Sequence, residues 1–282
     1  TTTGYLKRIF QPRLSKLSGK LQRAALVRII LLSLVILFYS SCEETGEGCL
    51  DLLAENYDFT AVDACQDCCT YPSLSMSLSL MNDTLSFDIG DTLTMNQADS
   101  IVIDRFLLLF SEFRLTGLSS EYKVIDSVEL RDSFIRDDFA FFDDEGTSVI
   151  GDTRFADFLE EFHITLGFSD LFSNLSNEFD NLDQDSRLDE ALDSLFIGGD
   201  KYCMAAFTFK YTSWDSLHSY QLPNTGETLM FNIGKEVSAG RDWRLEASID
   251  LQQLFHAIEP ELSDESIKEM LANNLSRSIH IK

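Results

Sequence analysis

The side chains best suited to chemistry in this sequence are its thiols, which gather in one short stretch. Five of the six cysteines lie between Cys42 and Pro72, in the run CEETGEGCLDLLAENYDFTAVDACQDCCTYP, which is rich in Asp and Glu and has no Lys or Arg. Thiols can form disulfides, accept lipid or bind metal, and the redox state of the compartment decides between these fates. The residues before the cysteines indicate that compartment.

Residues 1–41 have the features of a signal peptide. They contain seven Lys and Arg and no acidic residue, and they end in an apolar run of about eleven residues from Ile29 to Tyr39. That run is shorter than the roughly 20 residues of a membrane span, and the whole pattern is typical of an exported protein. Ser40-Ser41-Cys42 resembles the bacterial lipobox, with Tyr39 where Leu is usual. We expect lipidation at Cys42 and an outer membrane lipoprotein that faces the periplasm or the cell surface. An uncleaved anchor and ordinary secretion are the alternatives.

The net charge of residues 42–282 limits the kinds of molecule that this part of the chain can bind. The full sequence has 22 basic and 47 acidic residues, for a net charge of −25. Without the seven bases of the leader, residues 42–282 keep 15 bases and 47 acids, or −32. Such a surface repels nucleic acid and anionic lipid. We therefore expect no nucleic-acid partner, membrane contact through the lipid anchor alone, and a surface that favours cations; a protein partner stays open.

In an exported chain, clustered cysteines usually form disulfides. With Cys42 lipidated, four remain in this segment: Cys49, Cys65, Cys68 and Cys69. Adjacent cysteines bond to each other only with strain, so we expect two bridges that run from Cys68 and Cys69 back to Cys49 and Cys65. Bridges would hold a segment of this length, which is too short to build a core.

Two metal sites compete with this interpretation of the segment. Cys65-x-x-Cys68 has the spacing of a zinc site, but no second pair of cysteines or histidines follows it. Calcium would need the oxygen donors of the segment, namely Asp51, Asn56, Asp58, Asp63 and Asp67. Their spacing does not fit the EF-hand pattern, and its Gly is missing.

The run GCLDLLAENYDFTAVDACQDCCTYP resembles short modules that follow the lipidated Cys in many exported Bacteroidetes proteins. The matching positions are Gly48, Cys49, Asp51, Ala54, Asn56, Tyr57, Ala61, Cys65, Cys68, Cys69 and Tyr71. The resemblance implies a small disulfide-stapled spacer. The acidic Glu43, Glu44 and Glu47 also resemble a signal that sends such lipoproteins to the cell surface. We therefore expect a signal peptide over 1–41, a lipidated tether and spacer over 42–72, and one domain over 73–282.

The hydrophobic pattern of the third region predicts a β-sandwich with short peripheral helices, a mainly β fold. Strict alternation marks strands at 162–168 and 243–250, and a long run that is apolar on both faces marks a central strand at 101–115. Further strands are expected at 75–80, 84–88, 122–130, 202–211 and 228–234. Helices are expected at 153–162, after a capping box at Ser186, after Asp250, and from Ser263 to about Leu275.

The order of these elements resembles the MbnP-like copper-binding domain over roughly residues 75–281. The segments that carry the resemblance are VIDRFLLLFSEFRLTGLSSEYKVIDSVEL, HITLGFSDLFSN, GGDKYCMAAFTFKY, LMFNIGK and WRLEASIDLQQLF. The resemblance implies a copper-binding sandwich. Two positions depart from the family: Asn232 replaces the His of F-H-I-G, and Ala206 replaces the Trp of Met-x-Trp. An imidazole and an indole are thus missing where the family has them.

Few residues remain as metal ligands in this domain. Copper prefers imidazole and sulfur, so the candidate set is His163, Met204 and His280, with His163 first because it lies opposite the apolar face of its strand. All three also fit ordinary surface or packing roles. Calcium is the other candidate ion; Asp183-x-Asp185 starts like a calcium loop but lacks the closing Glu. Cys203 is expected to be a buried, reduced thiol.

No motif of a hydrolase, metalloprotease or phosphate-binding enzyme is present, so we expect a binding protein and not an enzyme. The leading hypothesis is a membrane-anchored exported lipoprotein with an MbnP-like domain that binds copper or another metal. The alternative is a metal-free structural or adhesion-like surface lipoprotein that kept the fold and lost the metal.

Overall fold

The computed structural model describes residues 46–95, 99–119, 121–123, 127–130, 133–136, 138–144, 146–168, 193–197 and 202–282. The signal peptide, Cys42, the Asp183 segment and the Ser186 capping box lie outside these residues. The chain divides into two compact units, residues 1–47 and 48–282. The second unit holds both the cysteine-rich segment and the sandwich. No helix within the described residues has both the length and the apolar composition of a membrane span.

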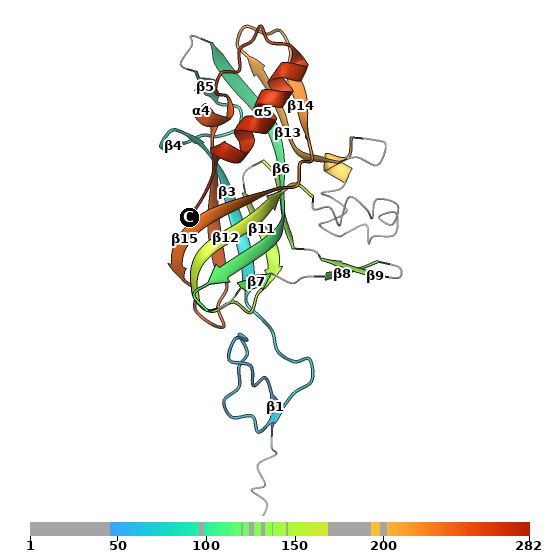
Figure 1. Cartoon of the computed structure of the whole chain (residues 1–282), viewed down its shortest axis with the longest axis vertical. Helices are drawn as coiled ribbons and strands as arrows, with labels where there is room; N and C mark the ends of the chain where they lie inside the picture. Colours follow the sequence, from blue (N-terminus) through green and yellow to red (C-terminus); the bar gives the residue numbers. More distant parts are fainter. Residues whose placement is uncertain are drawn as a thin grey trace, which may run out of the picture. The chain divides into compact units, whose positions relative to one another are not determined.

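Strands dominate the second unit, as the sequence predicts (Figure 1). The strands are β1 (Glu47–Gly48), β2 (Asp63–Ala64), β3 (Ser73–Asn82), β4 (Leu85–Ser86), β5 (Thr92–Thr94), β6 (Ser100–Gly117), β7 (Glu121–Lys123), β8 (Ser127–Leu130), β9 (Ser133–Arg136), β10 (Phe139–Asp143), β11 (Gly146–Asp152), β12 (Phe158–Leu166), β13 (Cys203–Tyr211), β14 (His218–Pro223), β15 (Glu227–Glu236), β16 (Trp243–Asp250) and β17 (Ile279–Ile281). The helices are α4 (Leu251–Leu254) and α5 (Asp264–Ser278).

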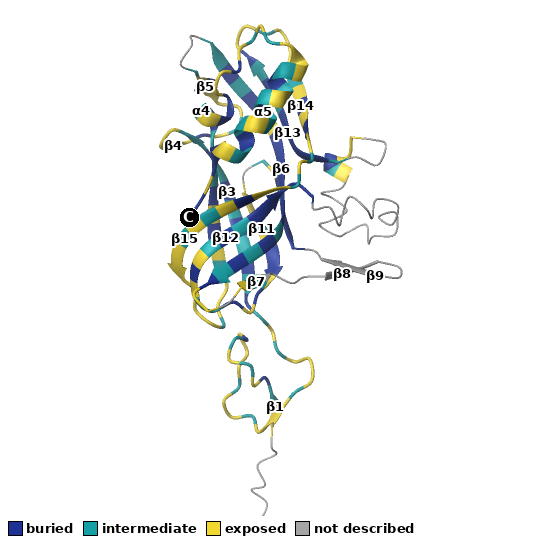
Figure 2. Ribbon diagram, in the orientation of Figure 1, coloured by how far each residue is buried: buried dark blue, intermediate teal, exposed yellow. Residues whose placement is uncertain are grey.

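Two sheets make the sandwich. The larger has the order β14-β13-β6-β12-β15, and β5, β7 and β10 also pair with β6. The smaller has the order β11-β3-β16-β17, with β4 paired to β3. Buried residues of both sheets, dark blue in Figure 2, belong to one hydrophobic cluster. The predicted β-sandwich is therefore confirmed, and the predicted central strand is β6.

Alternation explains which face of β3, one of the two middle strands of the smaller sheet, is buried. Leu and Met alternate with Ser along β3, and only the apolar positions from Leu74 to Leu80 are buried. The serine hydroxyls face the parallel neighbour β16, where Ser77 Oγ donates to the carbonyl of Leu245 at 3.4 Å. Period-two burial is what one buried face and one solvated face require.

Both predicted helix starts after residue 250 are confirmed. Asp250 caps α4 by accepting hydrogen bonds from the backbone amides of Gln252 and Gln253. Ser263 caps α5 by accepting from the amide of Ser266. Side-chain acceptors at these positions satisfy amides that the first helical turn leaves unpaired. α5 packs against α4 and β14.

The predicted helix over 153–162 is wrong. β11 continues to Asp152 and β12 begins at Phe158, so most of this segment is a connection and the start of a strand. Pairing of β12 with both β6 and β15 outweighs the local helix preference. A bulge between Leu159 and Glu161 shifts the register, which hides the strand periodicity in the sequence.

Candidate functional site

The cysteine-rich segment contains two disulfides, as predicted. Cys49 is bonded to Cys69, and Cys65 is bonded to Cys68. Each of the adjacent cysteines thus reaches back to an earlier one. The amide of Cys65 also donates to the carbonyl of Gly48 at 3.0 Å, which brings the start and end of the segment together.

Polar motif residues complete the spacer. Asn56 binds the backbone on both sides of Cys69: Nδ2 donates to the carbonyl of Cys68 at 2.7 Å, and Oδ1 accepts from the amide of Thr70 at 2.9 Å. Asp51 accepts from the amide of Leu53 and from the hydroxyl of Tyr71, both at 2.9 Å. The hydrogen bond from Leu53 lowers the pKa of Asp51 most, followed by that from Tyr71.

These internal bonds weaken the calcium hypothesis for the spacer. Asp51 uses both carboxylate oxygens inside the segment, and one oxygen of Asp58 accepts from the amide and hydroxyl of Thr60. Within the described residues, Asp51, Asp58, Asp63 and Asp67 do not gather into a group of three ligands. The spacer oxygens therefore serve to hold the loop.

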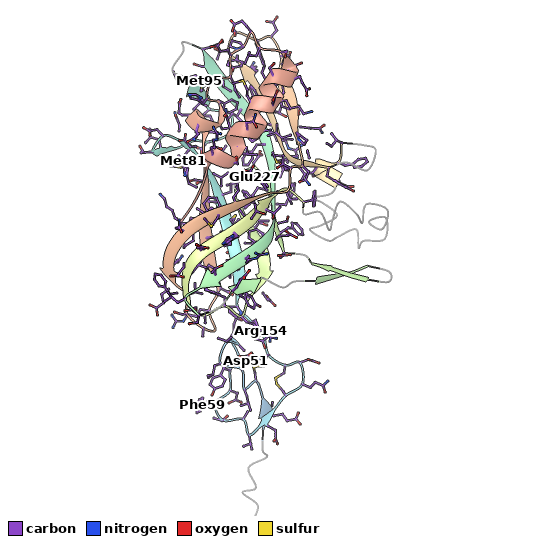
Figure 3. The ribbon with its side chains drawn as sticks, in the orientation of Figure 1. Asp51, Phe59, Met81, Met95, Arg154 and Glu227 are labelled. Carbon is purple, nitrogen blue, oxygen red and sulfur yellow. A yellow bond between two sulfur atoms is a disulfide. The ribbon has the colours of Figure 1, made fainter. Side chains whose placement is uncertain are left out.

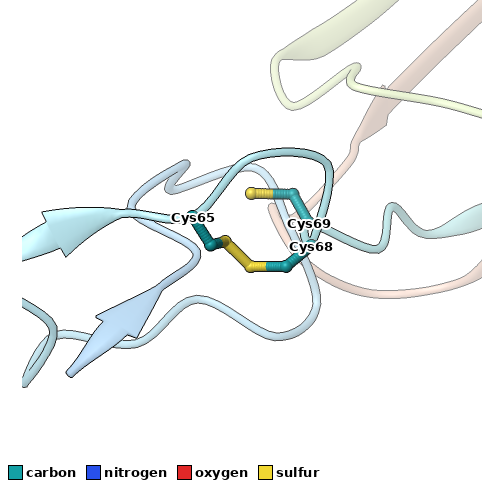
Figure 4. A group of neighbouring side chains, drawn as sticks. All are labelled: Cys65, Cys68 and Cys69. Carbon is teal, nitrogen blue, oxygen red and sulfur yellow. A yellow bond between two sulfur atoms is a disulfide. The ribbon is translucent and has the colours of Figure 1, made fainter.

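Three cysteine sulfurs form the one group in the described part of the chain where three His, Cys, Asp or Glu ligands lie within 4.8 Å of one another. These are Cys65, Cys68 and Cys69 (Figure 4). Metal binding by cysteine requires the thiolate, and here each of the three sulfurs is in a disulfide. A zinc ion would compete with both bridges, so in the oxidised protein this cluster is a staple.

His163 lies on β12 and points away from the sandwich core. Its neighbours Phe162 and Ile164 are fully buried, whereas the imidazole is partly exposed. Nε2 of His163 lies 3.1 Å from a carboxylate oxygen of Glu161. In the neighbouring strands it is paired with Met230 and Arg114. His163 therefore has one acidic partner on the outer face of the larger sheet.

Met204 lies in the hydrophobic core, although the alternation of β13 predicts it on the face opposite Phe207 and Phe209. Its exposed fraction is 0%, because the first part of β13 is buried on both faces. A bulge between Cys203 and Ala205 changes the register there. The thioether sulfur accepts from the hydroxyl of Thr225 at 3.5 Å. The predicted position of Met204 is thus corrected.

His280 belongs to a pocket of about 540 Å³ on the smaller sheet. It lies between the buried Ile279 and Ile281 on β17, so its imidazole points outward. The other polar or sulfur-bearing lining residues are Met81, Asp83, Thr84, Asn232, Ser248, Asp250 and Lys282. Lys282 places a positive charge in the lining beside the carboxylates. Figure 3 labels Met81 at the end of β3.

Strand register explains how these side chains meet. Met81 on β3 is paired with Asp250 on β16, and Ser248 on β16 is paired with His280 on β17. These positions share the outward-facing side of three adjacent strands. Asn232 comes from β15 of the larger sheet, which contacts β17. The pocket therefore brings together His280, a predicted ligand, and Asn232.

The pocket offers a thioether, an imidazole and carboxylates, a mixed donor set for a metal ion. One oxygen of Asp250 already accepts the two amides that α4 leaves free. The sequence analysis missed Met81 and Asp83, because they look like the end of a strand and a turn. His163 and Met204 do not line this pocket, so the three predicted ligands lie in three different surroundings.

No family model and no curated protein matches this chain. A search of solved structures finds similarity to MbnP from Methylosinus trichosporium, with a TM-score of 0.44 and 11% sequence identity. The alignment covers 67% of this chain and 79% of that chain. This is a distant relationship in fold, and it assigns neither a ligand nor an activity.

Proposed function

We propose that the chain is an exported, membrane-anchored lipoprotein whose β-sandwich binds a metal ion, with copper as the preferred ion. The site is the pocket of Met81, Asn232 and His280. The observation that carries this proposal is that a thioether and an imidazole from separate strands line one pocket, beside carboxylates. Thioether and imidazole are ligands that suit copper. The domain acts as a binding protein and not as an enzyme.

Asn232 sets the strength of this site. An amide is a poor copper ligand compared with imidazole, so the pocket has one strong nitrogen ligand instead of two. We therefore propose weak binding of a single ion, completed by Asp83 or by water. Outward-facing ligands leave that ion accessible for exchange with other molecules.

Export and anchoring rest on the leader and on the spacer. Disulfides persist in oxidising compartments outside the cytoplasm, and the spacer contains two of them. We propose that Cys42 carries the lipid and that the protein resides in the outer membrane, facing the periplasm or the cell surface. Replacing Cys42 by Ala should release the protein from the membrane fraction or block its maturation. A variant that fractionates and migrates like the parent would show that the anchor lies elsewhere.

Copper titration of the soluble protein from residue 43 onward tests the metal site. We expect one weakly bound copper ion, loss of binding in His280→Ala and weaker binding in Met81→Leu. His163→Ala is the matched control, because it also removes one outward-facing imidazole but lies outside the pocket. Copper binding that depends on His163 and not on His280 would place the site on β12 and overturn the pocket assignment.

The second candidate is a metal-free structural or adhesion-like surface lipoprotein. It is favoured by Asn232, and by the finding that the described residues contain no group of three His, Cys, Asp or Glu ligands outside the bridged cysteines. A wild-type protein that binds neither copper nor calcium in the same titration would support this candidate. Stoichiometric calcium with no copper would instead support a calcium-stabilised module.

A further inference from the structure

A second pocket, distinct from the metal site, lies where the end of β13 meets α4 and the loop between α4 and α5. Its volume is about 770 Å³, which is within the usual range for sites that bind small organic molecules. The lining residues that matter here are Met95, Asp99, Tyr211, Phe255, Glu259 and Glu261. Figure 3 labels Met95, one of these lining residues.

The walls of this pocket combine an apolar base with acidic sides. Tyr211 and Phe255 are buried at the base, and Met95 is half-buried. Glu259 and Glu261 are exposed. None of the described lining residues is Lys or Arg, so no cation of the chain within the lining neutralises these acids. The pocket therefore favours a ligand that is positively charged and partly apolar.

Asp99 is held in place as an ionised acceptor. Its carboxylate accepts from the hydroxyl of Thr212 at 2.8 Å, from the hydroxyl of Ser213 at 2.7 Å, and from the amide of Ser100 at 2.9 Å. The bonds from Ser213 and Thr212 are the main reasons that the pKa of Asp99 lies below its ordinary value. These hydroxyl donors orient the carboxylate of Asp99 and leave its negative charge in place. A lysine partner would instead neutralise that charge.

The loop after α4, which carries Glu259 and Glu261, is attached to the end of β13. The hydroxyl of Tyr211 donates to the carbonyl of Ile258 at 2.6 Å, which joins the end of β13 to the loop after α4. From α5, Nδ2 of Asn274 donates to the carbonyls of Leu254 and His256, both at 3.0 Å. The pocket is therefore largely formed before any ligand arrives, which lowers the entropic cost of binding.

The carboxylates of Asp99, Glu259 and Glu261 all contribute to the electrostatic potential at the hydroxyl of Tyr211. Burial is the main cause of the raised pKa of Tyr211, and the negative charges of Asp99, Glu259 and Glu261 add to it. Charges from two walls thus reach the phenol at the base. An ammonium group that enters the pocket would meet the same combined potential with the opposite sign of energy.

We infer that this pocket binds a small organic cation, namely an aliphatic amine whose ammonium groups pair with Glu259, Glu261 and Asp99 while its methylene chain lies on the apolar base. Amines of this kind are long, flexible and multiply charged, so they can contact carboxylates on two walls at once. The inference is independent of the proposed metal site, because the two pockets share no lining residue.

Calorimetric titration with spermidine, in about 0.15 M salt to screen diffuse attraction, tests this inference. We expect saturable binding at one site, and about fivefold weaker binding in each of Glu259→Gln and Glu261→Gln, since one charge pair near 4 Å in water is worth about that factor. Glu269→Gln is the matched control: it removes the same charge from an exposed position on α5 outside the pocket. Glu259→Asp keeps the charge and should keep most of the affinity.

Two further ligands, an uncharged triol and calcium, test which chemical feature of spermidine the pocket recognises. An uncharged triol of similar length should not bind, because it has the chain without the ammonium groups. Calcium should compete poorly, because the acids are spread over two walls. Equal weakening by Glu269→Gln, or the absence of saturable spermidine binding by the folded wild type, would overturn the inference. Tight calcium binding without spermidine binding would also overturn it and would identify a cation site of another class.

Discussion

Asn232 and His280 line one pocket although they belong to different sheets of the sandwich. Asn232 lies on β15, at the end of the larger sheet, and His280 lies on β17, at the end of the smaller one. The two sheet ends come into contact, so side chains far apart in the sequence become neighbours. A histidine at position 232 would therefore add a second imidazole to the proposed metal pocket.

Asn232→His should tighten copper binding by at least about tenfold, the factor that corresponds to 1.4 kcal/mol of added ligand energy. The reason is that imidazole replaces a poor amide ligand next to His280. Titration of this variant beside wild type measures the effect. Asn232→Gln serves as the control, since it changes size but adds no imidazole.

The double variant Asn232→His with His280→Ala separates the pocket from a new surface site. If both imidazoles hold the same ion, the double variant should lose the gain. A gain that persists without His280 would mean that the new histidine recruits other ligands. No change in any of these variants would leave the metal-free candidate as the better account of the domain.

Alternation and end signals were enough to predict much of the fold. The strands β3, β15 and β16 and both capped helices show period-two burial or a capping side chain, and each was found within a few residues. β13 was also found, although its first part is buried on both faces. β10, β11 and β14 are among the strands that were missed. β10 is buried on both faces at its start, and β14 is a short strand next to loops. β10 pairs with β6, which precedes it by several other strands, and local sequence does not contain that information. β14 pairs with β13, the strand just before it in the chain, so its shortness and not the distance of its partner explains the miss.

The candidate site was harder to predict than the fold. His280 was selected for its imidazole alone, and Asn232 was noted as a departure from a family motif but was not a predicted ligand. Their common pocket depends on which edge strands of the two sheets meet. Met204 shows the opposite difficulty, since alternation places it outside while a bulge and a doubly buried strand place it in the core. Single-strand patterns do not show which strands lie on either side.

Alkylation without reduction should label Cys203 alone in the protein from residue 43 onward, and only after denaturation. The other four cysteines are in disulfides. Cys203 is fully buried, and desolvation raises its pKa to about 11, so at pH 8 only about one thiol in a thousand is ionised. Mass spectrometry after labelling measures this. Rapid labelling of the native protein, or labelling of several spacer cysteines, would contradict it.

Asn56→Ala should loosen the spacer without loosening the sandwich. The change removes two hydrogen bonds that tie Asn56 to the backbone of Cys68 and Thr70, each worth about 1 kcal/mol. We expect faster reduction of the spacer disulfides by dithiothreitol and an unchanged melting temperature of the β-sandwich. Asn273→Ala, at an exposed position on α5, is the control. A similar rate of reduction in both variants would show that the disulfides alone hold the segment.

Where the spacer meets the start of β16, the pKa values of two carboxyl groups are shifted in opposite directions: that of Asp242 is lowered and that of Glu55 is raised. The amide and hydroxyl of Ser73 donate to Asp242 at 2.7 and 3.0 Å, and the bond from the amide is the main cause of the lowered pKa of Asp242. Desolvation and then the charge of Asp242 raise the pKa of Glu55, which donates a hydrogen bond to Asp242 when protonated. Protonation of Glu55 therefore stabilises its contact with Asp242.

Glu55→Gln should raise the stability of the folded protein at neutral pH. Glu55 has a higher pKa in the folded protein than in the unfolded chain, where it is near the ordinary value of 4.5. Its contribution to folding stability is therefore complete below the unfolded pKa and is lost as the pH rises through the folded pKa. At pH 7 wild-type Glu55 is ionised beside Asp242, and Gln removes that repulsion while keeping a donor. Near pH 3 wild-type Glu55 is protonated, so the advantage of Gln should vanish. Thermal unfolding at both pH values measures the difference, with Glu160→Gln at an exposed position of β12 as the control for lost charge. A stabilisation that is the same at both pH values, or the same in the control, would show that the pair of carboxyls is not its cause.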